Sequence, residues 1–220
     1  MKIARWLLVS ILPLGCAFTS KGEALTPRYF SPSLSSAAAA EGGSTSPARI
    51  AAPLELRVGR IEPAAHLEER IAYRVDESEL AYYEDRRWTE PPEQFVRRAL
   101  EGELFETRSF QRVVSGTAPT LDVEVLSFEE VRQGTPRARL SLLITLRDER
   151  RALLERTVTV EVNLGPGPDA DAGRALAKAM ADALARATRD VAERVAAELR
   201  SNGAGVAEAD LEPEGEKAGR

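Results

Sequence analysis

The sequence is poor in the residues that most enzymes use for catalysis or metal binding. Its 220 residues include one cysteine, Cys16, and one histidine, His66. A lone cysteine cannot form an internal disulfide, and no set of cysteines and histidines could hold zinc. Nothing near His66 resembles a G-x-S-x-G nucleophile elbow, and the glycine-rich phosphate-binding motifs are absent. We therefore expect no catalytic activity, no metal and no cofactor. His66 is interpreted as a loop residue, and the acidic pairs Glu68–Glu69 and Glu129–Glu130 as surface features.

Negatively charged residues outnumber positively charged ones. The chain has 30 Lys and Arg residues against 35 Asp and Glu residues. Removing residues 1–15 takes away Lys2 and Arg5, which leaves 28 against 35 and a formal charge of −7. Nucleic acids and anionic lipids attract proteins through a basic face. The composition thus argues against either as a charge-driven partner, and no nucleic-acid partner is expected.

The most hydrophobic run of the chain ends at its only cysteine. The stretch "MKIARWLLVSILPLGC" has a positively charged start and an apolar centre over residues 6–14, too short to span a bilayer as a helix. This order is typical of a signal peptide, here residues 1–15. It resembles the bacterial lipobox, although Pro13 stands where the lipobox has leucine. The alternative is an ordinary secretory signal peptide cut after Cys16 or Ser20, which would leave a soluble periplasmic protein.

The lipobox resemblance implies that signal peptidase II cuts before Cys16 and that this residue then carries fatty acyl chains such as palmitate. One acyl chain gives marginal membrane binding, whereas two or more give a stable anchor. Ala17 follows the cysteine, and by resemblance to enteric sorting an alanine there implies the outer membrane. We therefore expect a lipid-anchored protein on the periplasmic face of a bacterial membrane, the outer one.

Two segments of low complexity flank the expected domain. Residues 16–53 are rich in Ser, Ala, Gly and Pro without lasting periodicity, which is typical of a flexible tether. Tyr29 and Phe30 interrupt this tether. Residues 201–220 form an acidic, glycine-containing tail, and we expect it to be disordered.

Residues 54–200 show the regular apolar patterns of one α+β domain. Alternation predicts a hairpin over residues 71–85 and a three-stranded meander over residues 120–164. The apolar phase shifts between Val125 and Leu126, which indicates either a bulge or a strand covered on both faces. Pro91 and Pro92 suit the first turn of a helix. The predicted order is β-β-β-α-β-β-β-β-α, in a mixed or antiparallel sheet with both helices packed on one face. The last helix carries one apolar stripe: Leu176, Met180, Leu184, Ala187, Val191, Val195 and Leu199.

The aromatic residues are concentrated in "YRVDESELAYYEDRRWTEPPEQFV". One interpretation is structural: Tyr82 and Trp88 pack under the first helix, while Tyr83 points outward. The other is functional, because Tyr and Trp combine apolar area with a polar tip and are enriched at interfaces. In the functional interpretation, six residues form a candidate surface for a partner or a lipid, and a family resemblance selects them. They are Tyr73, Arg74, Tyr82, Tyr83, Trp88 and Pro91.

These residues resemble the pattern of the ABC-type transport auxiliary lipoproteins, also called PqiC-like and formerly a domain of unknown function. The resemblance covers residues 54–200 and the signal peptide, through "LRVGRI", the aromatic stretch, "LFETRSFQRVV", "LDVEVLSFEEV" and the alanine-rich last helix. It implies an accessory subunit of an ABC transporter that works with a mammalian-cell-entry (MCE) domain protein in lipid transport between membranes. It also implies that a segment after the cysteine, here around Tyr29, can dock onto the domain.

The resemblance therefore predicts a lipoprotein that is anchored by its acyl chains and docks an MCE-domain protein at a membrane. Exposed strand edges would allow addition of a partner strand or of further copies of the chain, so a homo-oligomer is plausible. Two alternatives stay open: a structural or assembly lipoprotein of another envelope complex, and a lipid carrier with an apolar cavity. The alanine-rich last helix argues against the carrier, because close packing of helix and sheet leaves little space.

Overall fold

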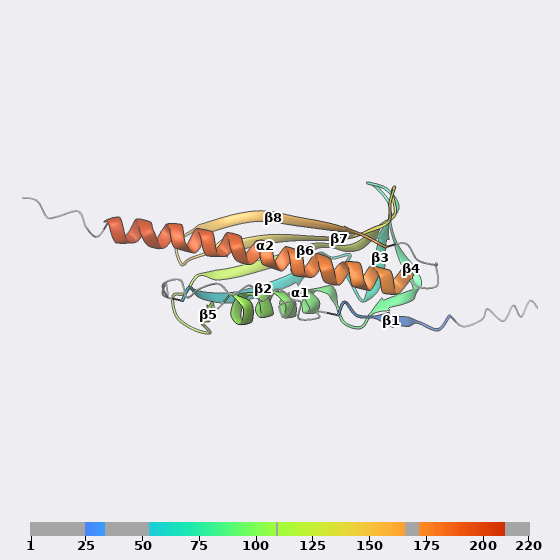
Figure 1. The fold of residues 1–220 in the computed structure, drawn as a ribbon, viewed down its shortest axis with the longest axis horizontal. Coiled ribbons are helices and arrows are strands. Elements are labelled where there is room, and N and C mark those ends of the chain that lie inside the picture. The colour runs from blue at the N-terminus through green and yellow to red at the C-terminus, as the bar shows by residue number, and fades with distance from the viewer. Residues whose placement is uncertain (1–24, 34–52, 109, 166–171, 210–220) are drawn as a thin grey trace, which may run out of the picture.

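The fold is a single mixed β-sheet covered on one face by two helices (Figure 1). The structure, a computed structural model, describes residues 25–33, 53–108, 110–165 and 172–209. The signal peptide, Cys16, most of the tether and the end of the tail lie outside these residues. The predicted α+β class is confirmed, and so is the order of elements from residue 54 onward.

The centre of the sheet is a long antiparallel meander, as the alternation predicts. Both of its junctions are antiparallel along nearly their whole length. The register shifts between Val125 and Ser127, which places a bulge at Leu126 and confirms the predicted phase change. Its three strands are β6 (Thr120–Val131), β7 (Arg137–Arg147) and β8 (Ala152–Asn163).

Two short strands share the other edge of β6. The first half of β6 pairs in parallel with β2 (Glu55–Pro63), and its second half pairs in parallel with β3 (Arg70–Arg74). The predicted hairpin is formed by β3 and β4 (Leu80–Trp88), which are antiparallel. A two-residue strand, β5 (Gln111–Arg112), extends the sheet beside β2.

Both helices pack on the same face of the sheet and against each other. Helix α1 (Pro92–Glu101) begins with a proline at its first position, where an N–H would lack a partner within the helix. It continues into a π-helical turn, η2 (Gly102–Thr107). Phe95, Leu100 and Leu104 are fully buried beneath these two elements. The predicted helix start is therefore confirmed.

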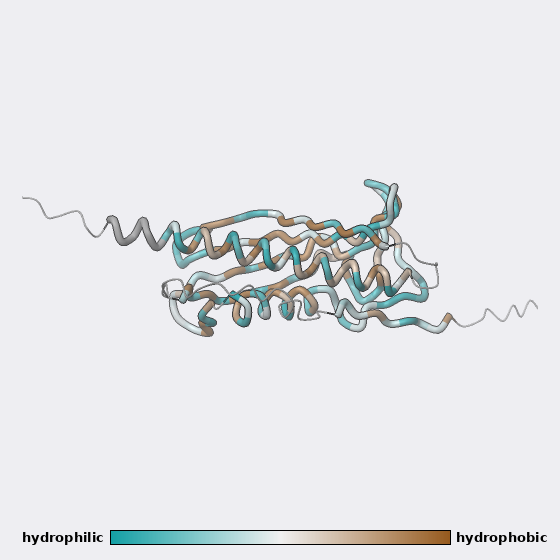
Figure 2. The backbone as a smooth tube through the Cα atoms, in the orientation of Figure 1, coloured by the Kyte–Doolittle hydropathy of each residue, from teal (hydrophilic) through white to brown (hydrophobic). Residues whose placement is uncertain are grey.

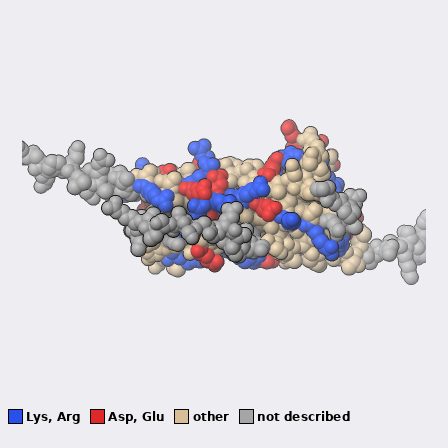
Figure 3. Space-filling model, viewed as in Figure 1, with Lys and Arg blue, Asp and Glu red and all other residues tan. Residues whose placement is uncertain are grey.

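Helix α2 (Ala172–Ala209) runs along the whole sheet (Figure 1). At 38 residues it is about 57 Å long. The predicted apolar stripe is buried from Leu176 to Val195, and small residues such as Ala183 bring the helix close to the sheet. Apolar and polar residues alternate along it (Figure 2), and basic and acidic side chains mingle along its outer face (Figure 3). Among the described helices, none is both long and apolar enough to cross a membrane.

Two features differ from the expected boundaries. Helix α2 continues to Ala209, into the tail expected to be disordered. In this last part of the helix, the side chains of Ser201 and Asn202 both donate to the Glu198 carbonyl, at 2.8 and 2.9 Å. The tether segment contains a strand, β1 (Arg28–Phe30), which pairs in parallel with the end of β4. This ordered piece agrees with the expected docking around Tyr29.

Strand β1 is fixed by apolar packing as well as by pairing. Phe30 is buried, and its carbonyl accepts a hydrogen bond from the Thr89 N–H at 2.9 Å. Its ring lies directly against the backbone of Gly173, where an added Cβ would come within 2.3 Å of the ring. Any residue larger than glycine would therefore force the Phe30 ring out of its position against the first turn of α2.

Candidate functional site

An aromatic and cationic cluster lies where the β3–β4 hairpin meets the end of β6. We call it the tyrosine–arginine cluster, made of Tyr73, Tyr83, Arg86, Glu130 and Arg132. The two tyrosine rings lie 4.8 Å apart, centroid to centroid. The Arg132 guanidinium lies 3.8 Å above the ring of Tyr73, and that of Arg86 lies 4.1 Å above the ring of Tyr83. Such cation–π contacts stabilise a cation without neutralising it.

The hydroxyl group of Tyr83 connects the two charged partners of the cluster. It donates to a carboxylate oxygen of Glu130 and accepts a hydrogen bond from Arg132 Nη2 at 2.6 Å. Burial, followed by the hydrogen bond to the Glu130 carboxylate, raises the pKa of Tyr83 to about 12. The phenol is therefore neutral at physiological pH and serves as a hydrogen-bond donor.

Arg86 is the least satisfied member of the cluster. Its Nε and Nη1 atoms are buried and have no hydrogen-bond partner. Among the described residues, its nearest carboxylate partner is Asp85, whose Oδ1 lies 3.9 Å from Arg86 Nε. The ring of Tyr83 is thus its main electrostatic contact.

A second charged network lies on the opposite face of the sheet. Neighbouring residues in a strand point to opposite faces, so Glu129 faces away from the helices while Glu130 faces them. Arg74 binds the Glu129 carboxylate through two nitrogens, at 2.7 and 3.2 Å, and Arg139 lies 3.7 Å from it. The hydrogen bond to Glu129 raises the pKa of Arg74 above its usual value. Arg139 and Arg137 in turn bind Glu161, at 2.6 and 2.7 Å.

The structure brings only some of the predicted site residues together. Tyr73 and Tyr83 meet in the cluster, and Arg74 lies on the other face of the same hairpin. Tyr82 lies outside the cluster: its hydroxyl group donates to the His66 carbonyl at 2.7 Å, in the turn between β2 and β3. Pro91 is the residue before the first turn of α1, where it opens the helix.

The prediction that Trp88 belongs to a contact surface is wrong. Its side chain is 1% exposed and lies edge-on to Phe95 and Phe128, with ring centroids 6.3 and 5.2 Å away. The structural interpretation, in which Trp88 packs under the first helix, is confirmed. A residue buried in this way can act on a partner only by holding the hairpin and α1 in place.

The sequence interpretation also missed the buried carboxylates. Glu129 and Glu130 were expected at the surface, but they are 0% and 5% exposed. Their arginine partners come from other strands and from the β6–β7 turn, so no local pattern marks them. The available signal was the strand itself, because "LDVEVLSFEEV" is apolar on both faces and its last residues were therefore candidates for burial.

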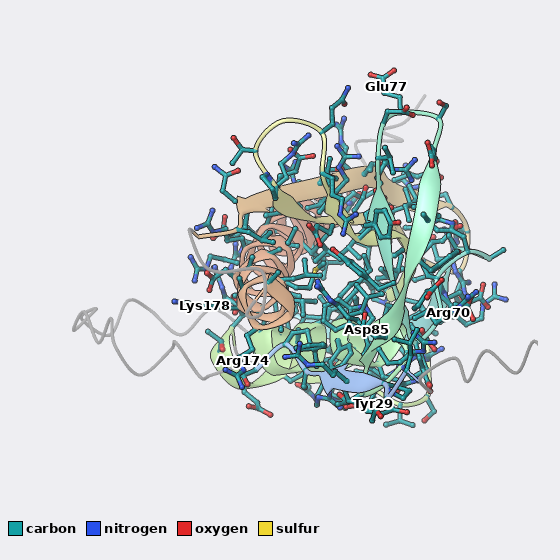
Figure 4. The ribbon with its side chains drawn as sticks, turned by 90° about the vertical axis from the view of Figure 1, so that its right-hand side faces the viewer. Tyr29, Arg70, Glu77, Asp85, Arg174 and Lys178 are labelled. Carbon is teal, nitrogen blue, oxygen red and sulfur yellow. The ribbon has the colours of Figure 1, made fainter. Side chains whose placement is uncertain are left out.

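A groove lies at the same end of the molecule, between β1 and the first turns of α2. We call it the β1–α2 groove, with a volume of about 660 Å³. Figure 4 looks at this end: Tyr29, Arg174 and Lys178 lie around the start of α2, and Glu77 marks the tip of the hairpin. In the described residues, no group of three or more His, Cys, Asp and Glu side chains could hold a metal ion. The groove is lined in part by Arg28, Tyr29, Phe30, Arg174, Lys178 and Asp182.

Comparison with known proteins places this architecture in a defined class. Protein XCC0632 from Xanthomonas campestris, of the family DUF330, is 20% identical, with a TM-score of 0.64 over 80% of this chain and 98% of that one. A second solved structure, of an uncharacterized protein, is 15% identical, with a TM-score of 0.59 over 77% of this chain and 99% of that one. These similarities establish the α+β fold that the three proteins share.

The family follows from the sequence match. The model of the family "ABC-type transport auxiliary lipoprotein component" matches residues 33–192, well over half of the chain. The chain belongs to this family. No curated protein matches it.

Proposed function

We propose that the protein is an acylated periplasmic lipoprotein of an ABC-type lipid transport system. It docks the MCE-domain subunit of that system at a membrane, and we propose the outer membrane as its location. Membership of the transport auxiliary lipoprotein family is the observation that carries this proposal. The position of Cys16 after an apolar run supports the acyl anchor. The role is one of positioning: the protein holds a partner near a membrane and carries out no chemistry on it.

The rigid hairpin end supports a docking role. Tyr73 and Tyr83 are held in place by Arg86 and Arg132, so little conformational freedom remains to be lost when a partner binds. An acyl anchor would confine this surface close to the bilayer and raise its effective concentration against a partner that reaches the same membrane. The partner contact is proposed for the exposed tip of the hairpin at Glu77 and for the partly exposed side chain of Arg74.

The free edge of β8 offers a second mode of contact. Within the described residues β8 pairs only with β7, and it is 12 residues long. Long unpaired edges accept further strands, either from a partner or from another copy of the chain. This edge is where we place a homo-oligomeric contact, if the protein forms one.

The proposal can be tested in cells with the full chain. A photo-crosslinking amino acid at Glu77 should capture an MCE-domain protein. The same group at Val114 should not, because Val114 is 84% exposed just after β5, and β5 lies at the other end of the molecule (Figure 1). Labelling with a palmitate analogue should mark the wild type and not the Cys16→Ser variant. Capture of envelope proteins that belong to no transporter would favour a structural lipoprotein of another complex instead.

A further inference from the structure

The β1–α2 groove has the position and the chemistry of a membrane-facing surface. We propose that the protein lies with this groove against the lipid bilayer and that the groove contacts the phosphate-bearing headgroup layer. The inference rests on the proposed acylation of Cys16, because the acyl anchor fixes where the bilayer is.

The first argument is the length of chain between the anchor and the fold. Arg28 is 12 residues after Cys16, and 12 fully extended residues reach about 40 Å. From Arg28 the chain is bound into the sheet as β1, and Phe30 packs against the start of α2. The end of the domain that carries β1 therefore cannot move farther from the bilayer than this short leash permits.

The second argument is that the leash is shorter than the molecule. Helix α2 alone is about 57 Å long, and its C-terminal half lies at the end opposite β1 (Figure 1). If the chain first joined the domain at β2, 39 residues after Cys16, the leash could reach about 130 Å and neither end would be favoured. The attachment of β1 to the sheet thus determines which end of the domain stays near the membrane.

The third argument is the composition of the surface at this end. Leu25 and Tyr29 are each 62% exposed, although apolar and aromatic side chains usually avoid water. A tyrosine beside basic residues suits the headgroup layer, where its ring contacts apolar atoms and its hydroxyl group stays wet. Basic side chains outnumber acidic ones along the groove, with Arg28, Arg174 and Lys178 against Asp182.

The overall negative charge of the chain does not oppose this contact. At physiological ionic strength, charges more than about 8 Å from a surface are largely screened, so the local lining decides the interaction. Lys178 lies in the groove, whereas the acidic tail follows Arg200 at the other end of α2. The excess of acidic residues belongs to the chain as a whole and not to this patch.

The experiment uses the fact that the acylated protein has no free thiol. Ser33 lines the groove and Ser115 lies in the exposed loop after β5, so Ser33→Cys and Ser115→Cys each introduce one labelling site with a matched substitution. The acylated full chain is reconstituted into vesicles of phosphatidylethanolamine and phosphatidylglycerol (3:1), and each cysteine carries an environment-sensitive fluorophore. Brominated lipids should quench the label at residue 33 at least threefold more than the label at residue 115.

The outcomes separate the inference from the proposed function. Mass spectrometry of the N-terminal peptide reports acylation directly, and an unmodified Cys16 would overturn both. Acylated protein with equal quenching at the two sites would overturn the membrane-facing groove alone. Shielding of residue 33 from aqueous iodide without lipid quenching would mean that a second copy covers the groove, which also contradicts the inference.

A charge reversal tests the headgroup contact separately from the leash. Lys178→Glu should reduce the lipid quenching at residue 33 by at least half, whereas Arg200→Glu, an exposed reversal near the far end of α2, should leave it unchanged. Equal quenching in both variants would show that the leash alone positions the domain, and the headgroup contact would be wrong.

Discussion

The two halves of β6 bury their side chains by different means. The first half, residues 120–125, pairs with β2 and places Leu121, Val123 and Val125 in the apolar core. The second half, beyond the bulge at Leu126, pairs with β3 and buries two adjacent carboxylates, Glu129 and Glu130. The second half also places Phe128 in the apolar core, so ion pairs, hydrogen bonds and cation–π contacts are added there to the hydrophobic effect.

This difference separates the part of the sheet that mainly stabilises the fold from the part that fixes the positions of particular side chains. Apolar burial contributes roughly 25 cal/mol per Å² and tolerates changes of shape. A buried ion pair adds little net stability over apolar residues of the same volume, but losing one partner is costly. The second half of β6 is therefore the part of the fold that fixes particular side chains in particular places, and it supports the hairpin proposed to contact a partner.

The largest expected effect comes from the apolar half. Leu121→Ala should lower the free energy of unfolding by about 4 kcal/mol, because the side chain is fully buried and leaves a cavity. Urea unfolding followed by circular dichroism measures the change. Leu121→Met should cost less than about 1.5 kcal/mol, because the apolar volume is conserved. Equal losses for the two variants would mean that cavity formation is not the cause.

Breaking the buried ion pair should cost slightly less. Arg74→Ala should reduce the free energy of unfolding by about 3 kcal/mol, because Glu129 then remains buried with only the distant Arg139 contact. Replacing both partners, as Arg74→Met with Glu129→Leu, should recover at least half of that loss. If the double variant were less stable than Arg74→Ala, the pair would stabilise the fold outright and the proposed contrast between the halves would fail.

Removing a hydroxyl group should have a smaller effect. Tyr83→Phe keeps the ring stacked between its arginines but removes the hydrogen bonds to Glu130 and Arg132, and should cost about 1 kcal/mol at neutral pH. The same urea series measures it. Tyr82→Phe, which loses a single bond to a backbone carbonyl, is the matched control and should lose less.

The same hydroxyl group should make stability depend on alkaline pH. The pKa of Tyr83 rises from 10.0 to about 12 on folding, so the protonated phenol is favoured in the native state. Its contribution is complete below pH 10 and is lost as the pH rises through about 12. Wild-type stability should therefore fall more steeply than that of Tyr83→Phe over this range. Phenolate absorbance at 295 nm should show one tyrosine fewer titrating late in the variant.

The smallest effect belongs to an ion pair of similar geometry at the surface. Arg98 binds Glu90 through two nitrogens, both at 2.9 Å, but both side chains are substantially exposed. Arg98→Ala should change the free energy of unfolding by about 0.5 kcal/mol, because water replaces the lost partner. A loss as large as that of Arg74→Ala would show that burial does not separate the two pairs.

Local patterns in the sequence predict much of the fold. Alternation gives the hairpin and the meander, the phase shift at Leu126 gives the bulge, and the prolines at residues 91 and 92 give the start of α1. The apolar stripe gives the buried face of α2. These features depend on residues close together in the chain, where periodicity and steric preference act directly.

The candidate site could be predicted only in part, because it depends on contacts between distant segments. Tyr73 and Tyr83 were selected from the sequence, but Arg86 and Arg132, which hold them, were not. The buried Glu129 is paired with Arg74 from β3 and Arg139 from β7. That pairing depends on β2 and β3 sharing one edge of β6, which the periodicity of the sequence does not predict. Trp88 was misassigned because a tryptophan in a polar stretch has the same local pattern at a surface and in a core.

The seating of Phe30 on Gly173 also sets how the molecule responds to tension. A pull on the N-terminal chain loads first a strand of three residues, the smallest force-bearing piece of the sheet. If that strand peels away, the length of chain between Cys16 and the first strand still bound grows from 12 residues to 39, and its greatest reach from about 40 Å to about 130 Å. Strand β1 would then detach under force before the rest of the domain unfolds. Its detachment lengthens the chain between the anchor and the domain, and the strand can pair with β4 again when the force ends.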